Sequence, residues 1–413
     1  MKYLVMLGDG MADYACAELN GLTPLQQANK PCMDALASAG ACGLVMTVPE
    51  GMVPESDTAN LAVLGYDPRI YSKGRSPLEA TSMGLTMKEN HTAFRCNLVT
   101  LTDKGEAYED KVILDHSSGE ISTEEADELI RAVEAELGTP LRHFYTGISY
   151  RHCMLWEDAP GSEAGERIYE FARPHDILGQ VIGEYLPRGP VGDAYGELMK
   201  KSFAILNRHP INQKRVAEGK NPANSIWFWS PGKKPALDSF ADRFGVKATV
   251  ICAVDLIKGI GLCAGMEAPA VKGATGGAVT DYAAKGRAAV EAYERGSDFV
   301  YIHVEAPDEC GHQGECRMKV GAIEAIDEKI LSPVKEYLDS TGEPYRILLL
   351  PDHPTPVSKR THTREAVPFV LYDSQKKAEG IGCYCESEAE KTGRYLPDAG
   401  GLMTLLFEKR GEK

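Results

Sequence analysis

Short, uninterrupted apolar runs alternate with stretches of helical periodicity along this chain of 413 residues. Three of these runs, at residues 3–7, 299–304 and 347–350, show no alternation with polar residues. Runs of this kind are typical of strands that are buried on both faces, as in a parallel sheet covered by helices. Each run is followed within a few residues by an aspartate: Asp9, Asp308 and Asp352. Because ligands of open α/β sheets bind at the carboxyl ends of the strands, we expect these three carboxylates to meet there.

Helical patterns fill much of the chain between the runs. Ser122 and Glu125 have the spacing of a capping box, and the apolar periodicity that follows predicts a helix that stops before Gly138. A second helix is predicted over residues 320–330. Residues 86–222 differ in texture, with strand-like pieces, loops rich in proline and glycine, and six of the ten histidines. We therefore expect an α/β fold with a doubly wound, mostly parallel sheet formed by residues 1–85 and 223–413, and a smaller α+β domain inserted at 86–222.

Composition and charge narrow the classes of partner. Hydrophobic residues make up 43% and charged residues 25% of the chain, as in ordinary globular proteins. The net charge of −15 argues against a nucleic acid or an acidic membrane face as partner, but it permits a small anionic substrate held by a metal ion or a local basic cluster. No apolar run approaches the roughly 18–20 residues of a membrane span. Eleven cysteines without paired CxxC spacing favour reduced thiols in a cytoplasm. We expect a monomer or a small homo-oligomer.

The polar residues near the three strand ends have the chemistry of metal ligands. Asp308 and His312 are four residues apart, so that one helical turn can present both to an ion. Asp352 and His353 are adjacent, and His362 follows nine residues later. With Asp9, these residues supply six donors, which is too many for one tetrahedral ion and suits two ions about 3.5–4 Å apart. Taken singly, each aspartate is more often a turn residue or a helix cap.

Ser56 is the candidate nucleophile. The segment that follows it is helical in pattern up to Gly65, which would place Ser56 at a helix N-terminus, where backbone N–H groups favour a phosphate. A serine hydroxyl becomes an effective nucleophile when a metal ion binds it. Three carboxylates and a serine alkoxide together match the charge of two divalent cations. A simple helix cap remains the alternative for this serine.

Eight short motifs are distributed along nearly the whole chain. They are GDGM at 8–11, SDTA at 56–59, GYDP at 65–68, FRCN at 94–97, PAN at 222–224, APDECGH at 306–312, DHPTP at 352–356 and HT at 362–363. In these motifs the sequence resembles the cofactor-independent phosphoglycerate mutases of the archaeal type, within the alkaline phosphatase superfamily. The resemblance implies an alkaline-phosphatase-like core, a small phosphorylated substrate, and two divalent metal ions, with manganese preferred to zinc or magnesium.

The resemblance also implies roles for particular residues. Asp9, Ser56, Asp352 and His353 would hold one ion, and Asp308, His312 and His362 the other. Ser56 would take the phosphoryl group from the substrate, and the dephosphorylated acid would turn and attack phosphoserine with its other hydroxyl. The residues expected near the substrate are Arg95, Asn97, Asp115, Arg151, Arg215 and Lys258. For any one of these cations a solvated surface position is the alternative.

Two segments depart from the archaeal pattern, DHSSGE at 115–120 and IWFWSPG at 226–232. They lack arginines that would clamp a phosphoglycerate, and they resemble a bacterial branch proposed to act as homoserine kinases. Asp115, Ser117 and Glu120 could face an amino-acid ammonium group, although the same run is equally a turn before the helix at Ser122. Mutase activity is thus the leading hypothesis. A homoserine kinase-like phosphotransferase, a phosphomonoesterase and a silent metal-binding paralogue remain as alternatives. The kinase alternative is weakened because the chain has no GxxxxGK[ST] motif to bind a nucleotide as phosphoryl donor.

Overall fold

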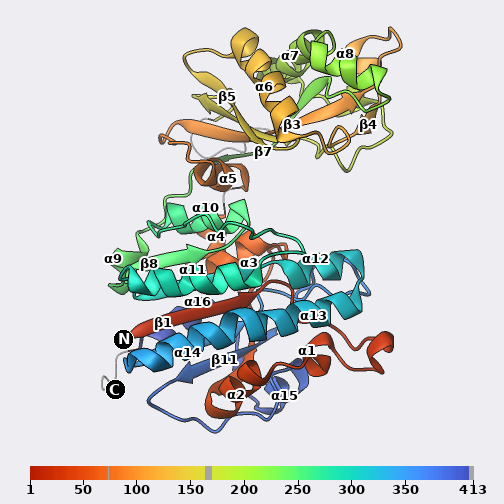
Figure 1. Cartoon of the computed structure of the whole chain (residues 1–413). Helices are drawn as coiled ribbons and strands as arrows, with labels where there is room; N and C mark the ends of the chain where they lie inside the picture. Colours follow the sequence, from red (N-terminus) through yellow and green to blue (C-terminus); the bar gives the residue numbers. More distant parts are fainter. Residues whose placement is uncertain (73, 163–169, 409–413) are drawn as a thin grey trace. The chain divides into compact units, whose positions relative to one another are not determined.

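The computed structural model describes residues 1–72, 74–162 and 170–408. It divides into two compact units, one formed by Met1–Ser72 and Ala236–Lys413 and the other by Lys73–Pro235 (Figure 1). The borders expected from the sequence, after residues 85 and 222, both lie inside the second unit. The reason is that helix α5 (Ser76–Ser82) and strand β7 (Ser225–Lys233) both pack on strand β3 (His91–Leu101) of that unit.

The first unit is built on a seven-stranded sheet in the order β12-β2-β11-β10-β1-β9-β8. The predicted strands are β1 (Lys2–Gly8), β9 (Phe299–Val304) and β10 (Tyr345–Leu350), and β1 pairs in parallel with both of the others. The remaining strands are β2 (Ala41–Val45), β8 (Ala248–Ile251), β11 (Val367–Asp373) and β12 (Tyr395–Leu396). Strand β11 runs antiparallel to both of its neighbours. The prediction of an α/β fold with a mostly parallel sheet is therefore confirmed.

Helices cover both faces of this sheet (Figure 1). On one face, Leu4, Ile302 and Leu349 share a core with α2 (Pro31–Ala39), α11 (Tyr282–Glu294), α13 (Cys316–Ile326) and α14 (Ser332–Thr341). The predicted helix at 320–330 is the end of α13 and a π-helical turn, Asp327–Leu331, that leads into α14. On the other face, Phe299 contacts Phe240 and Phe407. These two rings belong to α9 (Phe240–Phe244) and α16 (Gly400–Phe407), and α3 (Ser56–Val63) and α10 (Asp255–Cys263) pack together on this side.

The second unit is an antiparallel sheet in the order β4-β3-β6-β5, with β7 also paired to β3. Its other strands are β4 (Ile113–Asp115), β5 (Arg142–Ile148) and β6 (Arg151–Glu157). Helices α6 (Thr123–Leu137) and α7 (Gly189–Leu206) share one core with the sheet, followed along the chain by α8 (Pro210–Ala217), and α5 supplies Ala80 to a second, smaller core. Helix α6 begins as predicted, because the Ser122 hydroxyl accepts a hydrogen bond from the Glu125 backbone N–H at 3.3 Å, and it ends at Gly138.

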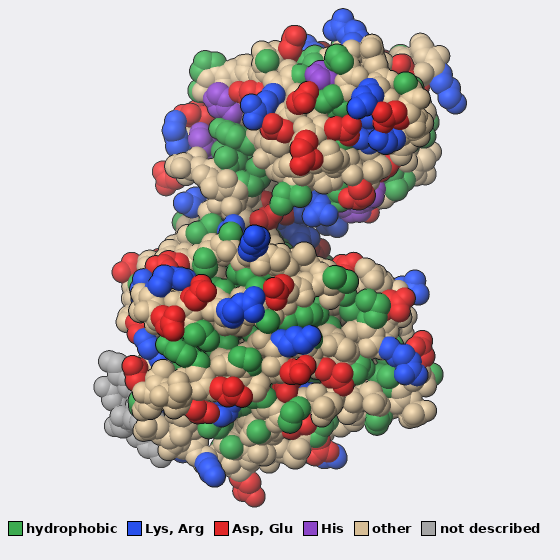
Figure 2. Space-filling model, viewed as in Figure 1, with side chains coloured by type: hydrophobic (Ala, Val, Ile, Leu, Met, Phe, Trp, Pro, Cys, Tyr) green, Lys and Arg blue, Asp and Glu red, His purple; other side chains and the backbone are tan. Residues whose placement is uncertain are grey.

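The surface of each unit mixes charges of both signs. Figure 2 shows Lys and Arg side chains interspersed with Asp and Glu over the visible face. Among the residues that the structure describes, no helix is both long enough and apolar enough to cross a membrane.

Candidate metal centre and nucleophile

The three aspartates meet at one edge of the first sheet. Strand β1 lies between β9 and β10, with Gly8 paired to Val304 and Leu7 paired to Leu350. Asp9 follows β1, Asp352 follows β10, and Asp308 lies on α12 (Ala306–Gln313), directly after β9. All three side chains are buried. The parallel strands thus bring Asp9 together with two carboxylates that follow it hundreds of residues later in the sequence.

The first group of candidate ligands surrounds the His353 ring. The Nε2 atom of His353 lies 3.7 Å from Asp9 Oδ1, 3.6 Å from Asp352 Oδ2 and 3.4 Å from the Ser56 hydroxyl. Ligand atoms of Asp9, Asp352 and His353 all lie within 4.8 Å of one another. This is the grouping that the resemblance implied for the first ion.

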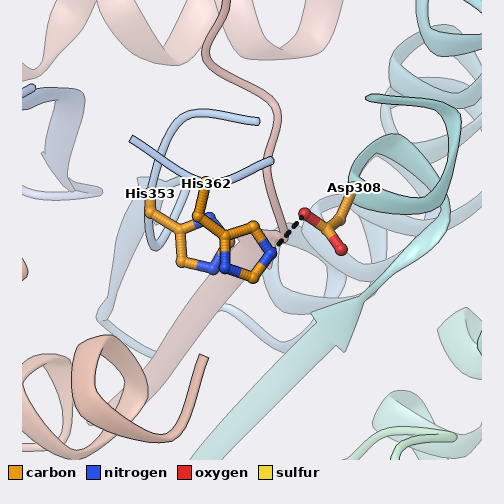
Figure 3. Close-up of side chains that lie close together, drawn as sticks. All are labelled: Asp308, His353 and His362. Atoms are coloured by element: carbon orange, nitrogen blue, oxygen red, sulfur yellow. Dashed lines mark ion pairs between the residues drawn. The ribbon is translucent and has the colours of Figure 1, made fainter. Parts of the chain in front are cut away.

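The second group of candidate ligands centres on Asp308. Its Oδ2 lies 3.2 Å from His312 Nε2, and its Oδ1 lies 3.3 Å from His362 Nε2. Figure 3 shows the His362 ring directed at the Asp308 carboxylate and stacked beside His353, with the two ring centroids 4.0 Å apart. The two groups are therefore contiguous, as a centre with two adjacent ions requires.

Backbone carbonyls orient the two outer histidines. The Nδ1 atom of His362 lies 2.8 Å from the Pro54 carbonyl oxygen, and that of His312 lies 3.0 Å from the Arg360 carbonyl oxygen. Because a carbonyl only accepts, each Nδ1 carries a proton, which leaves each Nε2 as the ring atom directed at Asp308. The two Nε2 atoms are only 3.0 Å apart. Loss of the Nε2 protons would turn two imidazole lone pairs toward the Asp308 carboxylate, so the arrangement fits a metal ion.

The buried carboxylates carry negative charge that a cation would compensate. Burial, with the nearby charges of Asp352, Asp308 and Glu305, raises the pKa of Asp9 well above its usual value. Its Oδ1 atom is buried without a hydrogen-bond partner among the described residues. Burial also opposes ionisation of Asp308, but hydrogen bonds from His312 and His362 outweigh it and hold the Asp308 pKa well below the usual value. Buried anions in this number are stable only when cations compensate their charge.

Ser56 is the first residue of α3, and Glu55 is its N-cap. The half-buried serine hydroxyl faces the metal-ligand cluster through His353. The first backbone N–H groups of a helix have no partner within the helix, and with the helix dipole they favour a phosphate. The candidate nucleophile and backbone N–H groups suited to a phosphate therefore lie at one helix end.

Several residues that support the cluster escaped the sequence analysis. The Thr355 hydroxyl donates to Asp308 Oδ1 and lies 3.3 Å from His353 Nδ1. Asn60 donates to Asp352, and Glu305 joins Asp9 and Asp308 in a third set of neighbouring carboxylates. Thr355 lies two residues after His353 and Asn60 lies one helical turn after Ser56, so their proximity to the ligands was a signal in the sequence.

Trp229 joins two of the predicted substrate residues in the second unit. The Arg95 guanidinium lies 4.4 Å from the centre of the Trp229 ring and also pairs with Glu79. Asn97 accepts a hydrogen bond from Trp229 Nε1 at 3.0 Å. The ring of His175 lies against the same tryptophan, 5.4 Å away between centroids.

Two other predicted substrate residues are engaged inside the second unit. Arg215 is buried and donates to the Asn221 and Ser118 carbonyl oxygens and to Glu125. Asp115 accepts hydrogen bonds from Ser117, Gly119 and Asn221, which makes residues 115–120 the turn that the sequence analysis held open. These contacts satisfy both side chains without a ligand.

The last two predicted substrate cations are more accessible. Arg151 is exposed, and its guanidinium lies 5.0 Å from the centre of the Tyr150 ring in the second unit. Lys258 is half-buried on α10 of the first unit. Their accessibility is what a substrate contact requires.

The sequence and the fold are both similar to those of known proteins. A sequence model of the family described as 2,3-bisphosphoglycerate-independent phosphoglycerate mutase matches residues 37–212. The chain is 46% identical over 409 residues to the mutase of this name from Methanosarcina mazei, covering 99% of this chain and 100% of that protein. A solved structure of a Pyrococcus horikoshii protein is similar, with a TM-score of 0.81, 28% identity and coverage of 100% of this chain and 98% of that one. The cofactor-independent phosphoglycerate mutase of Thermoplasma acidophilum is also similar, with a TM-score of 0.67, 25% identity and full coverage of both chains.

Proposed function

Because the chain belongs to the family of 2,3-bisphosphoglycerate-independent phosphoglycerate mutases, we propose that it interconverts 3-phosphoglycerate and 2-phosphoglycerate through a phosphoryl group carried on Ser56. The observation that carries the proposal is the position of the Ser56 hydroxyl, at a helix N-terminus and 3.4 Å from His353 within a cluster of buried metal-type ligands. An isomerase that moves a phosphoryl group by way of the enzyme needs such a nucleophile, with cations beside it that these ligands would hold.

The ligand sets follow from the two groups of side chains. We assign Asp9, Ser56, Asp352 and His353 to one divalent ion and Asp308, His312 and His362 to the other. When bound, the ions would lower the pKa of the serine hydroxyl and neutralise charge on the phosphoryl oxygens. Manganese is our choice of ion, because the mixture of carboxylate and imidazole ligands suits it.

The chain's own groups then position the reacting atoms. The backbone N–H groups at the start of α3 would receive the phosphoryl oxygens, and the fixed Ser56 hydroxyl would attack phosphorus in line with the leaving oxygen. The glycerate would then turn so that its other hydroxyl attacks phospho-Ser56. Water has to be kept out during this step, because hydrolysis of phospho-Ser56 would end the transfer as free phosphate.

For the substrate we retain Arg95, Asn97, Arg151 and Lys258 as candidate contacts. Arg215 and Asp115 are better assigned to the frame of the second unit, since each of these side chains is hydrogen-bonded to three neighbouring residues. The reassignment of Asp115 removes the main residue-level argument for an amino-acid acceptor. Because the relatives are named as mutases, the homoserine kinase, phosphomonoesterase and silent-paralogue alternatives are not favoured.

The test is a mutase assay on protein loaded separately with Mn²⁺, Zn²⁺ or Mg²⁺, without added bisphosphoglycerate. We expect 3-phosphoglycerate and 2-phosphoglycerate to exchange fastest with Mn²⁺, and Ser56→Ala to abolish exchange. Ser38→Ala is the control, because its exposed hydroxyl donates to the Ala35 carbonyl oxygen within the same helix, α2. Consumption of homoserine with a phosphoryl donor but no exchange would overturn the proposal, and so would release of phosphate without transfer.

We also propose that the enzyme works in the cytoplasm, since its eleven cysteines are all free thiols. A fusion of the full chain to a fluorescent protein would test this location. Accumulation of the fusion outside the cytoplasm would contradict it.

A further inference from the structure

Asn60 links the nucleophile to a metal ligand through one side-chain amide. The residue is fully buried on α3, one helical turn after Ser56. Its Nδ2 donates to the Ser56 carbonyl oxygen at 2.8 Å and to Asp352 Oδ2 at 2.9 Å. Its Oδ1 accepts from the Tyr301 hydroxyl at 2.5 Å. All the polar atoms of the Asn60 side chain are thus engaged by three different segments of the first unit.

The Tyr301 hydroxyl determines which way this amide faces. Tyr301 is fully buried on β9, and burial above all raises its pKa, so the hydroxyl stays protonated and donates to the amide oxygen. The opposite side of the amide meets two acceptors, the Ser56 carbonyl and the Asp352 carboxylate, which only an NH₂ group can satisfy. A flipped amide would turn its oxygen toward the carboxylate and leave the tyrosine hydroxyl facing a donor.

Asp352 depends on this amide for its own orientation. Its Oδ1 accepts from the backbone N–H groups of Gly10 at 3.1 Å and His353 at 2.9 Å, and its Oδ2 accepts from Asn60. A carboxylate has about four lone-pair positions, so donors of the protein occupy most of them. Without the Asn60 donor, Oδ2 is free to rotate about the remaining contacts, and the lone pair intended for an ion loses its fixed direction.

We infer that Tyr301 and Asn60 form a positioning pair, in which the tyrosine hydroxyl orients the amide and the amide holds both Asp352 and the backbone of Ser56 for metal binding and phosphoryl transfer. The inference rests on the proposed function, because it takes Asp352 as a metal ligand and Ser56 as the nucleophile. It assigns to a tyrosine with no contact to the substrate an effect on the affinity of the metal and on the rate of the chemical step.

The test compares Tyr301→Phe with Tyr293→Phe. Tyr293 is a matched control in the same unit, since it is buried and its hydroxyl donates to a backbone oxygen, that of Tyr3, at 2.9 Å. Each change removes one buried hydroxyl from an otherwise intact ring. Affinity for Mn²⁺ alone would be measured on metal-free protein from the electron paramagnetic resonance signal of the free ion, and kcat and KM would be measured on the loaded enzymes.

We expect Tyr301→Phe to weaken Mn²⁺ binding and to lower kcat about tenfold each, with KM unchanged within about twofold. Tyr293→Phe should leave the Mn²⁺ affinity and kcat within about twofold of the wild type. A purely structural role for the Tyr301 hydroxyl predicts equal effects of the two changes, and that result would overturn the inference.

Asn60→Leu supplies a second and independent test, also if Tyr301→Phe folds poorly. Because the hydroxyl acts only through the amide, Tyr301→Phe should cause no further loss of Mn²⁺ affinity in an Asn60→Leu background. Additive losses in the double variant would contradict the inference. These results separate failure of the inference from failure of the proposed function. If the proposed function fails, the wild-type protein itself neither binds Mn²⁺ nor exchanges phosphoglycerates.

Discussion

A buried ion pair holds together the loops that carry the metal-type ligands. Lys319 on α13 donates to Asp13 Oδ2 at 2.7 Å and to the carbonyl oxygens of Thr355 at 2.9 Å and Ala12 at 3.3 Å. Asp13 also accepts from the backbone N–H of Val357. Neither charged side chain is accessible to solvent. Lys319 therefore connects the loop after β1, which begins at Asp9, with the loop after β10.

We predict that Lys319→Met lowers the free energy of unfolding of the first unit by about 3–5 kcal/mol. Methionine fills most of the volume of lysine, but it leaves the Asp13 carboxylate buried without a partner charge, which is the expensive part of breaking such a pair. Adding Asp13→Asn should recover part of this loss, because no buried charge then remains. Lys30→Met is the control: Lys30 is equally buried, but its partner Asp34 keeps 32% of its side-chain exposure, so water compensates and the loss should be about 1 kcal/mol.

Urea unfolding can separate the two units by their chromophores. All three tryptophans, Trp156, Trp227 and Trp229, belong to the second unit. Tryptophan fluorescence therefore follows that unit, while far-ultraviolet circular dichroism follows both. We expect Lys319→Met to shift the dichroism transition and to leave the fluorescence transition in place. Losses equal to those of Lys30→Met, or no recovery with Asp13→Asn, would refute the reasoning.

Three further predictions concern pH, charge burial and metal. Burial lowers the pKa of His152 to about 3 in the folded protein, whereas the unfolded chain binds this proton below about pH 6.5. The free energy of unfolding of the second unit should therefore fall by about 2 kcal/mol from pH 7 to pH 5. Tryptophan fluorescence in urea measures this loss, which should be smaller in His152→Gln. Arg215→Met should lower the free energy of unfolding of that unit by about 3 kcal/mol in urea. Arg131→Met removes a largely exposed pair with Asp127 and should leave the urea midpoint unchanged, so equal losses would contradict the structural assignment of Arg215. Mn²⁺ at about a thousand times its Kd should stabilise the first unit by about 4 kcal/mol, and a dichroism melting curve unchanged by the ion would count against the site.

The sheet of the first unit could be predicted because its central strands carry two signals at once. Each has an apolar run without alternation, and each is followed by an aspartate at the edge where parallel strands end. Helix α6 was predictable from the local chemistry of Ser122 and Gly138. The place of β7 was not, because an apolar strand such as Ser225–Lys233 fits either sheet, and only its pairing with β3 assigns it to the second unit.

Some residues of the candidate site could likewise be predicted from the sequence, and others could not. Asp9, Asp308, Asp352 and their histidines were found because ligand chemistry requires those residue types near strand ends. The hydrogen bond between Tyr301 and Asn60 joins residues 241 positions apart, and no local pattern marks it. Arg215 and Arg151 were both candidate substrate cations in the sequence, and only the tertiary structure, which buries Arg215 and exposes Arg151, separates their roles.

The most direct test of the account is anomalous X-ray diffraction from crystals of the Mn²⁺-loaded protein at the manganese absorption edge. The account predicts two peaks about 3.5–4 Å apart, one contacted by Asp9, Ser56, Asp352 and His353 and the other by Asp308, His312 and His362. Peaks located elsewhere, or a fully loaded protein with no peak beside Ser56, would contradict the claim that metal ions activate this serine.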